Sequence, residues 1–186
     1  MPLDHAILGF IDFQPMSGYD LKKFFDVSVV HFWSATQSHI YKSLELSEKM
    51  GWVEAHLVLQ TGKPNRKEYQ ITAAGHAELR RWLTTPLAFE QPRHSWLIQI
   101  FFSQVSSNEE IAALLEIRME HIRARLRSFR GEVQSGLNQD ATPIGVERAQ
   151  RLWQMTLDYG LDYYEFELAG HEKALARVRT LPPSPQ

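Results

Sequence analysis

Three cationic side chains, Lys63, Arg66 and Lys67, fall within five positions of the sequence, and no acidic residue interrupts them before Glu68. The surrounding segment, residues 61–71, reads Thr-Gly-Lys-Pro-Asn-Arg-Lys-Glu-Tyr-Gln-Ile. Its Gly-Lys-Pro-Asn stretch favours a turn, so the segment predicts a β-hairpin with cations at its tip. Such a hairpin, when it follows a helix-turn-helix pattern, presents cations to the phosphates and the minor groove of DNA.

A second group of polar side chains falls on the helix predicted upstream of the hairpin. We expect this helix to begin at a capping box, Ser34-Ala-Thr-Gln37, and to end with Gly51 as its C′ residue. Ile40 and Leu44 set its buried side, and a rotation of about 100° per residue places polar residues opposite. The outer face and its flank carry Gln37, Ser38, Tyr41, Lys42, Glu45 and Lys49.

Four residues in the first half of this helix have the chemistry to contact DNA. Gln37, Ser38 and Tyr41 donate hydrogen bonds to phosphates or base edges, and Lys42 adds positive charge. The N-terminal half of a recognition helix is the part that enters the major groove. Glu45 would face phosphates unfavourably unless it accepts from a cytosine amine. The alternative is an amphipathic helix whose outer face is only solvated.

Tyr19 is a further candidate because it lies at the start of a helix, within the capping box Ser17-Gly-Tyr-Asp20. Its hydroxyl could reach a phosphate while the ring packs against the protein. The alternative is that Tyr19 belongs to the core, as aromatic residues on short helices usually do.

The elements that position these residues follow from the apolar pattern. A first helix at about 3–13 stops before Pro15, and its buried residues are expected to be Leu3, Ile7, Leu8, Phe10 and Ile11. The second helix runs to about Phe25. Strands at 52–59 and 67–71 flank the hairpin tip, and Thr72 caps a fourth helix that ends at Leu83. This order predicts a winged helix-turn-helix DNA-binding domain at 1–85.

The rest of the chain is helical by its pattern. Residues 86–92 predict a linker, 93–178 a helical dimerisation domain and 179–186 a disordered tail. The fold class is therefore mainly α with a small β-hairpin wing. A long helix begins at a capping box, Ser107-Asn-Glu-Glu110, and carries apolar residues at the spacing of a coiled-coil seam. These residues are Ile111, Leu115, Met119, Ile122, Leu126, Phe129 and Val133.

The last helix, predicted at 144–178 after a break at 136–143, has two apolar stripes. One comprises Trp153, Leu157, Gly160, Tyr164 and Leu168; the other comprises Tyr159, Tyr163 and Phe166. A helix that is apolar on two sides must be covered on two sides, so we expect a homodimer.

Aromatic residues of the C-terminal half offer a candidate site for a small aromatic or apolar effector. The residues singled out are Trp96, Phe102, Trp153 and Tyr163. The alternative is that these rings belong to the core and the dimer seam. A run of five arginines also stands out, and we expect it to be a solvated face paired with Glu116 and Glu120, or else to meet phosphates or an acidic partner surface. The run comprises Arg118, Arg123, Arg125, Arg127 and Arg130.

Composition limits the remaining possibilities. The chain has 186 residues and a formal net charge of −2, which does not exclude DNA because binding depends on local cations. It has no cysteine, so disulfides and thiolate metal sites are excluded. No apolar run approaches the roughly 20 residues of a membrane helix, and we expect a cytoplasmic, nucleoid-associated protein. No nucleophile elbow, phosphate-binding loop or histidine pair suggests a cofactor, a metal or catalysis.

Several segments, in this order and spacing, resemble the PadR family of transcriptional regulators. They are Ile7-Leu-Gly-Phe, Met16-Ser-Gly-Tyr-Asp-Leu, His31-Phe-Trp, Ser38-His-Ile-Tyr, Gly51-Trp-Val-Glu, Gly62-Lys-Pro-Asn-Arg-Lys-Glu-Tyr and Ile71-Thr-Ala-Ala-Gly. With the helical segments Arg93–Phe102 and Trp153–Tyr164, the resemblance covers about residues 3–178.

The resemblance implies a homodimeric winged-helix protein that binds a palindromic operator on double-stranded DNA and usually represses, with a small aromatic or phenolic effector that releases DNA in several members. By similarity, Tyr19, Ser38 and Tyr41 would contact DNA, and Lys63, Arg66 and Lys67 would meet the backbone or the minor groove. One departure is Ser47, where the family usually has leucine; either Trp52 and Met50 fill the space or the helix is rotated.

Two other function classes remain as alternatives. A winged-helix adaptor would bind proteins and show no specific DNA binding, and its affinity for DNA would not depend on the wing cations. An enzyme that uses the aromatic residues as a substrate cavity would need a nucleophile, a base or a metal set that the sequence does not suggest.

Overall fold

The computed structural model describes residues 2–29, 32–59, 65–89, 91–133 and 147–183. These residues fall into two compact units, one within residues 1–87 and the other within residues 88–133 and 147–186. The first unit combines helices with a small antiparallel sheet, and the described part of the second is helical. The predicted fold class is therefore confirmed, while the dimerisation role of the second unit stays a prediction.

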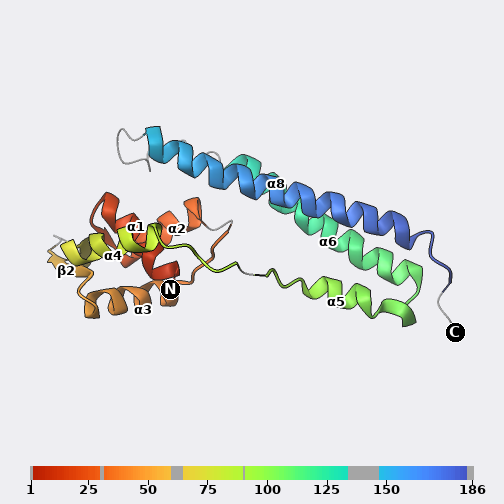
Figure 1. The fold of residues 1–186 in the computed structure, drawn as a ribbon, viewed down its shortest axis with the longest axis horizontal. Helices are drawn as coiled ribbons and strands as arrows, with labels where there is room; N and C mark the ends of the chain where they lie inside the picture. The colour runs from red at the N-terminus through yellow and green to blue at the C-terminus, as the bar shows by residue number, and fades with distance from the viewer. Residues whose placement is uncertain (1, 30–31, 60–64, 90, 134–146, 184–186) are drawn as a thin grey trace. The chain divides into compact units, whose positions relative to one another are not determined.

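The first unit has the element order predicted for a winged helix-turn-helix (Figure 1). Its elements are α1 (Pro2–Phe13), β1 (Met16–Ser17), α2 (Gly18–Ser28), α3 (Gln37–Lys49), β2 (Val53–Val58), β3 (Arg66–Ile71) and α4 (Ala73–Leu83). The sequence did not predict β1, because a strand of two residues, of which Ser17 is also the N-cap of α2, carries no strand pattern.

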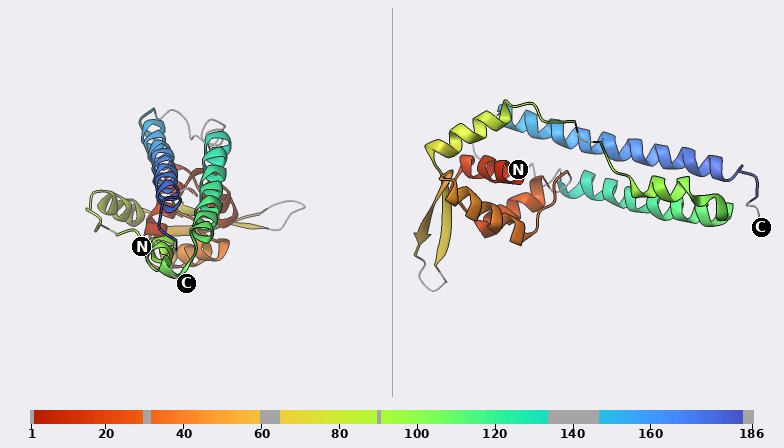
Figure 2. Two further views of the ribbon diagram at one scale, coloured as in Figure 1. Left: turned by 90° about the vertical axis from the view of Figure 1, so that its right-hand side faces the viewer. Right: turned by 60° about the horizontal axis from the view of Figure 1, so that its bottom comes forward.

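The sheet is antiparallel with the strand order β1-β3-β2. Val53 pairs with Ile71 and Val58 with Arg66, so β2 and β3 form a hairpin ladder, and β1 adds Met16 opposite Tyr69. The hairpin projects from the helices of this unit (Figure 2). The described part of the wing is thus a ribbon anchored at its base by the buried side chains of Val53 and Tyr69.

The helices of the first unit enclose one apolar core. Its buried members are Ile7, Leu8, Ile11, Met16, Leu21, Phe25, Ile40, Leu44, Val53, Tyr69 and Leu79. Leu3 and Phe10, which the sequence predicted as buried, are partly buried and pack against this cluster. Because α1, α2, α3 and both long strands all contribute, the core fixes the orientation of α3 and of the wing base together.

Caps define where the helices begin. The capping box of Ser17 and Asp20 at α2 is confirmed, and Thr72 caps α4 as predicted. The predicted box at Ser34 is wrong: Thr36 is the N-cap of α3 and accepts from the backbone N–H of His39, because its spacing to the first helical turn is the correct one. Gly51 follows α3 with φ of +72°, the left-handed conformation expected of a C′ glycine.

Ser47 is fully buried on α3, and among the residues that the structure describes its hydroxyl has no hydrogen-bond partner. Of the two residues predicted to fill the space, Trp52 packs partly buried against the core cluster, whereas Met50 is 54% exposed. Ser43 also faces the core, where its hydroxyl donates to the buried Asp4 carboxylate of α1. The core side of α3 therefore carries both a satisfied and an unsatisfied hydroxyl.

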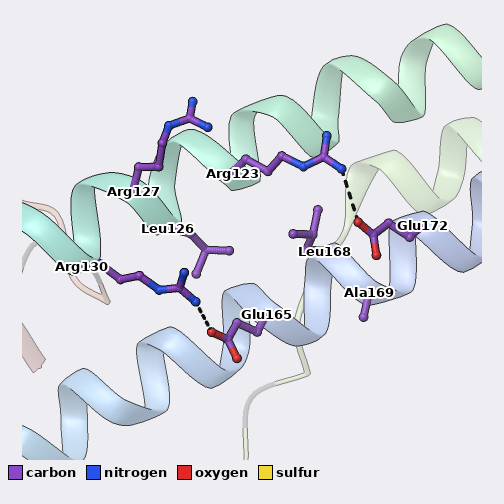
Figure 3. A pocket seen from close by; sticks show the side chains of 8 residues that line it. All are labelled: Arg123, Leu126, Arg127, Arg130, Glu165, Leu168, Ala169 and Glu172. Carbon is purple, nitrogen blue, oxygen red and sulfur yellow. Dashed lines mark hydrogen bonds and ion pairs between the residues drawn. The ribbon is translucent and has the colours of Figure 1, made fainter.

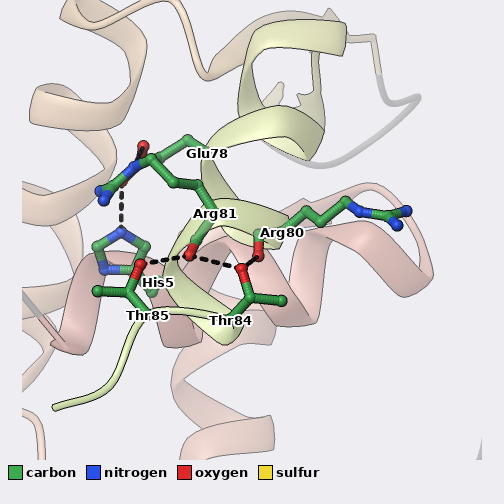
Figure 4. A network of polar contacts seen from close by, with 6 residues as sticks. All are labelled: His5, Glu78, Arg80, Arg81, Thr84 and Thr85. Carbon is green, nitrogen blue, oxygen red and sulfur yellow. Dashed lines mark hydrogen bonds and ion pairs between the residues drawn. The ribbon is translucent and has the colours of Figure 1, made fainter.

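A polar network joins α4 to α1 (Figure 4). Glu78 accepts from Arg81 at 2.6 and 2.7 Å and lies 2.8 Å from Nε2 of His5. The His5 ring stacks on Trp82 with centroids 4.7 Å apart. The hydrogen bonds from Arg81 and then His5 lower the pKa of Glu78 to about 2. Glu78 is thus held ionised at a partly buried contact between two helices.

The second unit contains α5 (Ser95–Phe101), the 3-10 turn η1 (Ser103–Val105), α6 (Asn108–Ser128), the π-helical turn η2 (Phe129–Val133) and α8 (Glu147–Val178). The capping box of Ser107 and Glu110 at α6 is confirmed. In the described parts of the chain, no helix combines the length and the apolar character that crossing a bilayer requires.

Helices α6 and α8 run side by side, with α5 next to α6 (Figure 1). The predicted seam of α6 is buried from Ile111 to Phe129, and α8 contributes Leu157, Leu175 and Val178. The side chain of Val133 and the predicted break at 136–143 lie outside the described residues. The period of the apolar residues thus identified the inner face of α6.

The arginine run pairs mainly across helices, which differs from the prediction. Arg118, Arg123 and Arg130 of α6 and η2 pair with acids of α8, namely Glu167, Glu172 and Glu165. Arg127 pairs with Glu120 as expected, at 2.8 Å, but Glu116 pairs with Arg179. Spacing along one helix could not reveal acids that a neighbouring helix presents.

The outward side of α8 carries an exposed apolar stripe. Tyr159 is 71% exposed, Phe166 73% and Tyr163 40%, and Leu152 and Met155 are exposed as well. In the helical rotation, these residues lie opposite Leu157 and Leu175, which face α6. The second apolar side predicted for this helix is therefore left uncovered within the second unit.

Candidate nucleic-acid interface

The predicted reading residues of α3 face solvent. Gln37, Ser38, Tyr41 and Lys42 are all exposed, while Ile40 and Leu44 on the opposite side are fully buried. The buried hydrogen bond between Ser43 and Asp4 adds a polar constraint to the rotation of the helix about its axis. The side chains that could donate to phosphates or base edges are therefore directed away from the core.

Tyr41 is also a contact between the two helices of the helix-turn-helix. A Cβ atom added at Gly18, the first residue of α2, would lie 2.7 Å from Cε1 of Tyr41. The ring is nonetheless 38% exposed, so one side chain packs on α2 while still facing solvent. Glycine at position 18 is what allows α2 to approach the ring so closely.

Tyr19, the next residue of α2, is 56% exposed, and Nζ of Lys23 lies 4.7 Å from its ring centroid. The core alternative considered for Tyr19 is therefore wrong, and its hydroxyl is free of the core. A cation beside an exposed tyrosine adds positive charge next to a hydrogen-bond donor.

The described cations of the wing are engaged by acids of three elements. Arg66 hydrogen-bonds Glu68 of its own strand and lies 3.7 Å from Asp20 of α2. Lys67 donates to Glu48 of α3 at 2.9 Å, and its Nζ lies 5.1 Å from the ring centroid of Tyr69. Lys63, the third predicted cation, lies outside the described residues.

The hydrogen bond to Glu48 is the main cause that raises the pKa of Lys67 above its ordinary value. Burial raises the pKa of the neighbouring Tyr69. Lys67 is therefore firmly cationic at neutral pH and remains half-exposed. By contrast, Lys42 on α3 forms no ion pair within the described part of the chain.

Sequence reasoning did not select Glu48, Glu68 or Asp20 as members of this surface. Glu48 precedes Lys67 by 19 positions, and their contact depends on the hairpin register and on how β3 lies against α3. One feature of the sequence indicates such pairing indirectly: the region has nearly balanced charge, with acids close to the cation cluster. That feature does not say which acid meets which cation.

The four residues predicted for an effector are spread over the second unit. Trp96 of α5 contacts His171 with ring centroids 4.1 Å apart and planes tilted by 34°, and Arg118 lies 5.3 Å from the Trp96 ring centroid. Phe102 is 61% exposed beside Phe101. Trp153 and Tyr163 are ten positions apart on α8, which separates them by about 15 Å along the axis. One small ligand could not contact all four in this arrangement.

A groove of about 360 Å³ lies elsewhere, between α6 and α8, and none of those four residues lines it (Figure 3). Leu126, Leu168 and Ala169 contribute its apolar side chains, and two ion pairs cross between the helices. Those pairs are Arg123–Glu172 and Arg130–Glu165. Within the described residues, no group of three or more histidine, aspartate or glutamate side chains could hold a metal ion.

Two family models match the chain. The model of the transcriptional regulator PadR-like family matches residues 7–81, and the model named virulence activator alpha C-term matches residues 92–179. These ranges correspond to the first unit and to the helices of the second.

Curated relatives are transcriptional regulators. The chain is 28% identical over 178 residues to the negative transcriptional regulator PadR of Bacillus subtilis, covering 95% of this chain and 97% of that protein. It is 46% identical over 92 residues to the probable transcriptional regulator Rv1176c of Mycobacterium tuberculosis, covering 50% of this chain. That second match spans about half of the relative, 49% of its length.

Solved structures agree with the fold. Bacillus subtilis PadR in complex with operator DNA superposes with a TM-score of 0.81 at 25% identity, covering 96% of this chain and 99% of that one. The same protein in complex with p-coumaric acid gives a TM-score of 0.77 at 24% identity and covers 96% of each chain. The winged helix-turn-helix and the helices that follow it are therefore shared with regulators of this type.

Proposed function

Because the chain belongs to the PadR-like family of transcriptional regulators, we propose that it is a homodimeric repressor that binds a palindromic operator. We further propose that a small aromatic or apolar effector releases it from DNA. The family consists of DNA-binding regulators and not of enzymes. The proposal places the protein in the cytoplasm, at the nucleoid.

One observation supports the proposal: those predicted DNA contacts that lie in the described residues are exposed on three elements of the first unit. Tyr19 on α2, the exposed face of α3 and the cations of β3 are all accessible. The wing strand lies beside both helices, since Arg66 is 3.7 Å from Asp20 of α2 and Lys67 is 2.9 Å from Glu48 of α3. A recognition helix and a wing that are fixed beside each other can engage a groove and its flanking phosphates together.

In this mechanism α3 enters the major groove, where Gln37, Ser38 and Tyr41 donate to base edges or phosphates. Lys42 and the wing cations Lys63, Arg66 and Lys67 neutralise the backbone, and Tyr19 donates to a phosphate. A two-fold dimer then reads two half-sites about one helical turn, or roughly 34 Å, apart. The exposed stripe of α8 supports the dimer, since an apolar face of this extent needs a cover.

Support for an effector comes from Bacillus subtilis PadR, which has been solved with p-coumaric acid. An effector releases DNA only if it binds one arrangement of the two reading heads better than the other. If the aromatic residues of α8 bind it, substitution of Trp153 and Tyr163 by alanine should abolish release by every active ligand. DNA release that is unchanged in this variant would rule out the α8 site.

The decisive experiment is fluorescence anisotropy with DNA from the upstream region of the protein's own gene and with scrambled DNA of equal length, across salt concentrations. We expect preference for the native DNA and a steep salt dependence, because phosphate contacts release counterions. Equal, weak binding to both DNAs would contradict an operator in that region.

A wing variant identifies the phosphate contacts. The substitutions Lys63→Gln, Arg66→Gln and Lys67→Gln together should weaken binding to both DNAs and flatten the plot of log K against log salt by about 0.9 per lost contact. A matched control removes three exposed cations of the second unit, Arg148, Lys173 and Arg177, and should leave the slope unchanged. An adaptor that binds proteins would show no change with either variant.

A further inference from the structure

The wing cation Lys67 already has an anionic partner in the free protein. Glu48, in the last turn of the recognition helix, accepts a hydrogen bond from its ammonium at 2.9 Å. A carboxylate at this distance occupies the position that a DNA phosphate oxygen would take, since both are anionic acceptors of the same bond. Arg66 has the same relation to Glu68 and Asp20.

The Lys67–Glu48 ion pair is exposed enough for a phosphate to replace the Glu48 carboxylate. Lys67 is 49% exposed and Glu48 40%, so water screens their attraction. Exposed pairs of this kind shift an equilibrium by about fivefold or less. A bond of that strength restrains the lysine, yet a phosphate in the high charge density of DNA can displace the carboxylate.

The cations of α3 and of the wing differ in their partners. Lys42, on the same helix as Glu48, forms no ion pair in the described part of the chain, while both described wing cations do. Glu48 lies on the last turn of α3, away from the N-terminal half that reads bases. Its carboxylate therefore acts on the wing cation, which contacts phosphate, and not on base readout.

We propose that Glu48 is an intramolecular competitor of DNA: it holds Lys67 in the free protein and must be displaced by a phosphate when the wing binds. This inference rests on the proposed function, in which Lys67 meets the DNA backbone. Glu48 is thus an affinity-determining residue that acts through Lys67. It lowers binding to every DNA sequence alike, because phosphate contacts carry no sequence information.

Salt gives the competition a distinct signature. Added salt weakens the Lys67–Glu48 pair as well as the attraction to DNA, so the two effects partly offset each other in the wild type. Without the carboxylate this offset disappears. The variant Glu48→Gln should therefore bind operator and scrambled DNA about two- to fivefold more tightly at low salt, with a steeper salt slope, and converge with the wild type at high salt.

A double-mutant cycle separates this mechanism from a general change in charge. The gain from Glu48→Gln should fall to less than half when Lys67→Gln is already present. The control Glu109→Gln removes the same charge from an exposed residue of α6 and should leave affinity and slope at the wild-type values. An equal gain with and without Lys67, or weaker binding by Glu48→Gln, would overturn the inference.

A sequence-independent probe keeps this test apart from that of the proposed function. On heparin, Glu48→Gln should elute at higher salt than both the wild type and Glu109→Gln. If that shift occurs but no operator is bound specifically, the competition stands and the repressor proposal fails. If specific operator binding occurs and Glu48→Gln elutes and binds like the wild type, the repressor stands and the competition is wrong.

Discussion

At the scale of single residues, a few buried or partly buried polar groups join the helices of the first unit, which carries the proposed DNA-binding surface. Ser43 of α3 donates to Asp4 of α1, Ser47 is buried on the core side of α3, and Glu78 joins α4 to α1. Burial makes each such group either stabilising or destabilising according to whether it has a partner. The two serines of α3 allow a direct comparison.

Substitution of Ser47 by alanine should stabilise the first unit by about 1 kcal/mol, because it removes a fully buried hydroxyl without a partner. Ser43→Ala is the matched control on the same helix, and it should destabilise by about 1–3 kcal/mol because Asp4 loses a buried hydrogen bond. Urea unfolding followed by tryptophan fluorescence measures both. Equal effects of the two substitutions would contradict this account.

Glu78 should make stability depend on acidity. Its pKa is about 2 in the folded protein, below the ordinary value of 4.5, because Arg81 and His5 donate to it. A lowered folded pKa contributes stability that is fully present above about pH 4.5 and is lost as pH falls through about 2. Allowing for the exposure of Arg81, we expect Glu78→Gln to lose about 1–2 kcal/mol at pH 7 and almost nothing at pH 2.

Urea unfolding between pH 7 and pH 2 tests this prediction. The control Glu45→Gln, on the exposed face of α3, should follow the pH profile of the wild type. A difference between wild type and Glu78→Gln that stayed constant over this range would show that the carboxylate acts by packing and not by charge.

At the scale of elements, close backbone approach between α4 and β2 fixes the base of the wing. A Cβ atom at Gly75 would lie 2.1 Å from the carbonyl oxygen of Trp52, which also accepts a bond from the Thr72 N–H at 3.0 Å. The first turn of α4 therefore rests directly on the chain that leads into β2.

Gly75→Ala should destabilise the first unit by about 2–4 kcal/mol, since backbone has to move to admit the methyl group. Gly9→Ala in α1 is the matched control: a Cβ atom there meets nothing within 4 Å, and alanine should stabilise the helix by about 0.5–1 kcal/mol. Thermal unfolding by circular dichroism distinguishes the two. If Gly75→Ala left the unfolding temperature unchanged, the backbone at Trp52 would have to move away from the methyl group at little cost.

The sequence was most informative about the buried faces and the starts of the helices. Periodicity identified the buried faces of α1, α3 and α6, because a long apolar pattern averages over many residues. The capping boxes of Ser17 and Ser107 located two helix starts, whereas Ser34 misled because Thr36 has a suitable hydroxyl two positions later. Contacts between elements, such as Lys67 with Glu48, depend on tertiary packing, and no local pattern encodes them.

At the scale of the whole molecule, the exposed stripe of α8 gives the proposed dimer a test. Substituting Tyr159 and Phe166 by glutamate should convert a dimer to a monomer, because charges would be buried without partners in the interface. Ala176→Glu, at an exposed position of α8 outside the stripe and the groove, is the control. Sedimentation measures the mass, and operator affinity should fall more than tenfold only where the dimer is lost.

An unchanged mass for the stripe variant would exclude α8 as the dimer contact. A monomer that kept full operator affinity would instead contradict the need for two reading heads. Because both measurements use the same variants, the assembly and its role in DNA binding are tested separately.

The small sheet has a consequence for solubility. Strand β1 pairs only with Glu68 and Tyr69 of β3, and within the described residues no other strand pairs with Arg66 and Lys67 on that side. Charged side chains on such an edge discourage pairing between molecules that ends in aggregation. The cations of the wing therefore keep the hairpin from joining its neighbours at high concentration. Apolar replacements at Arg66 and Lys67 should precipitate where glutamine stays in solution, whatever they do to DNA binding.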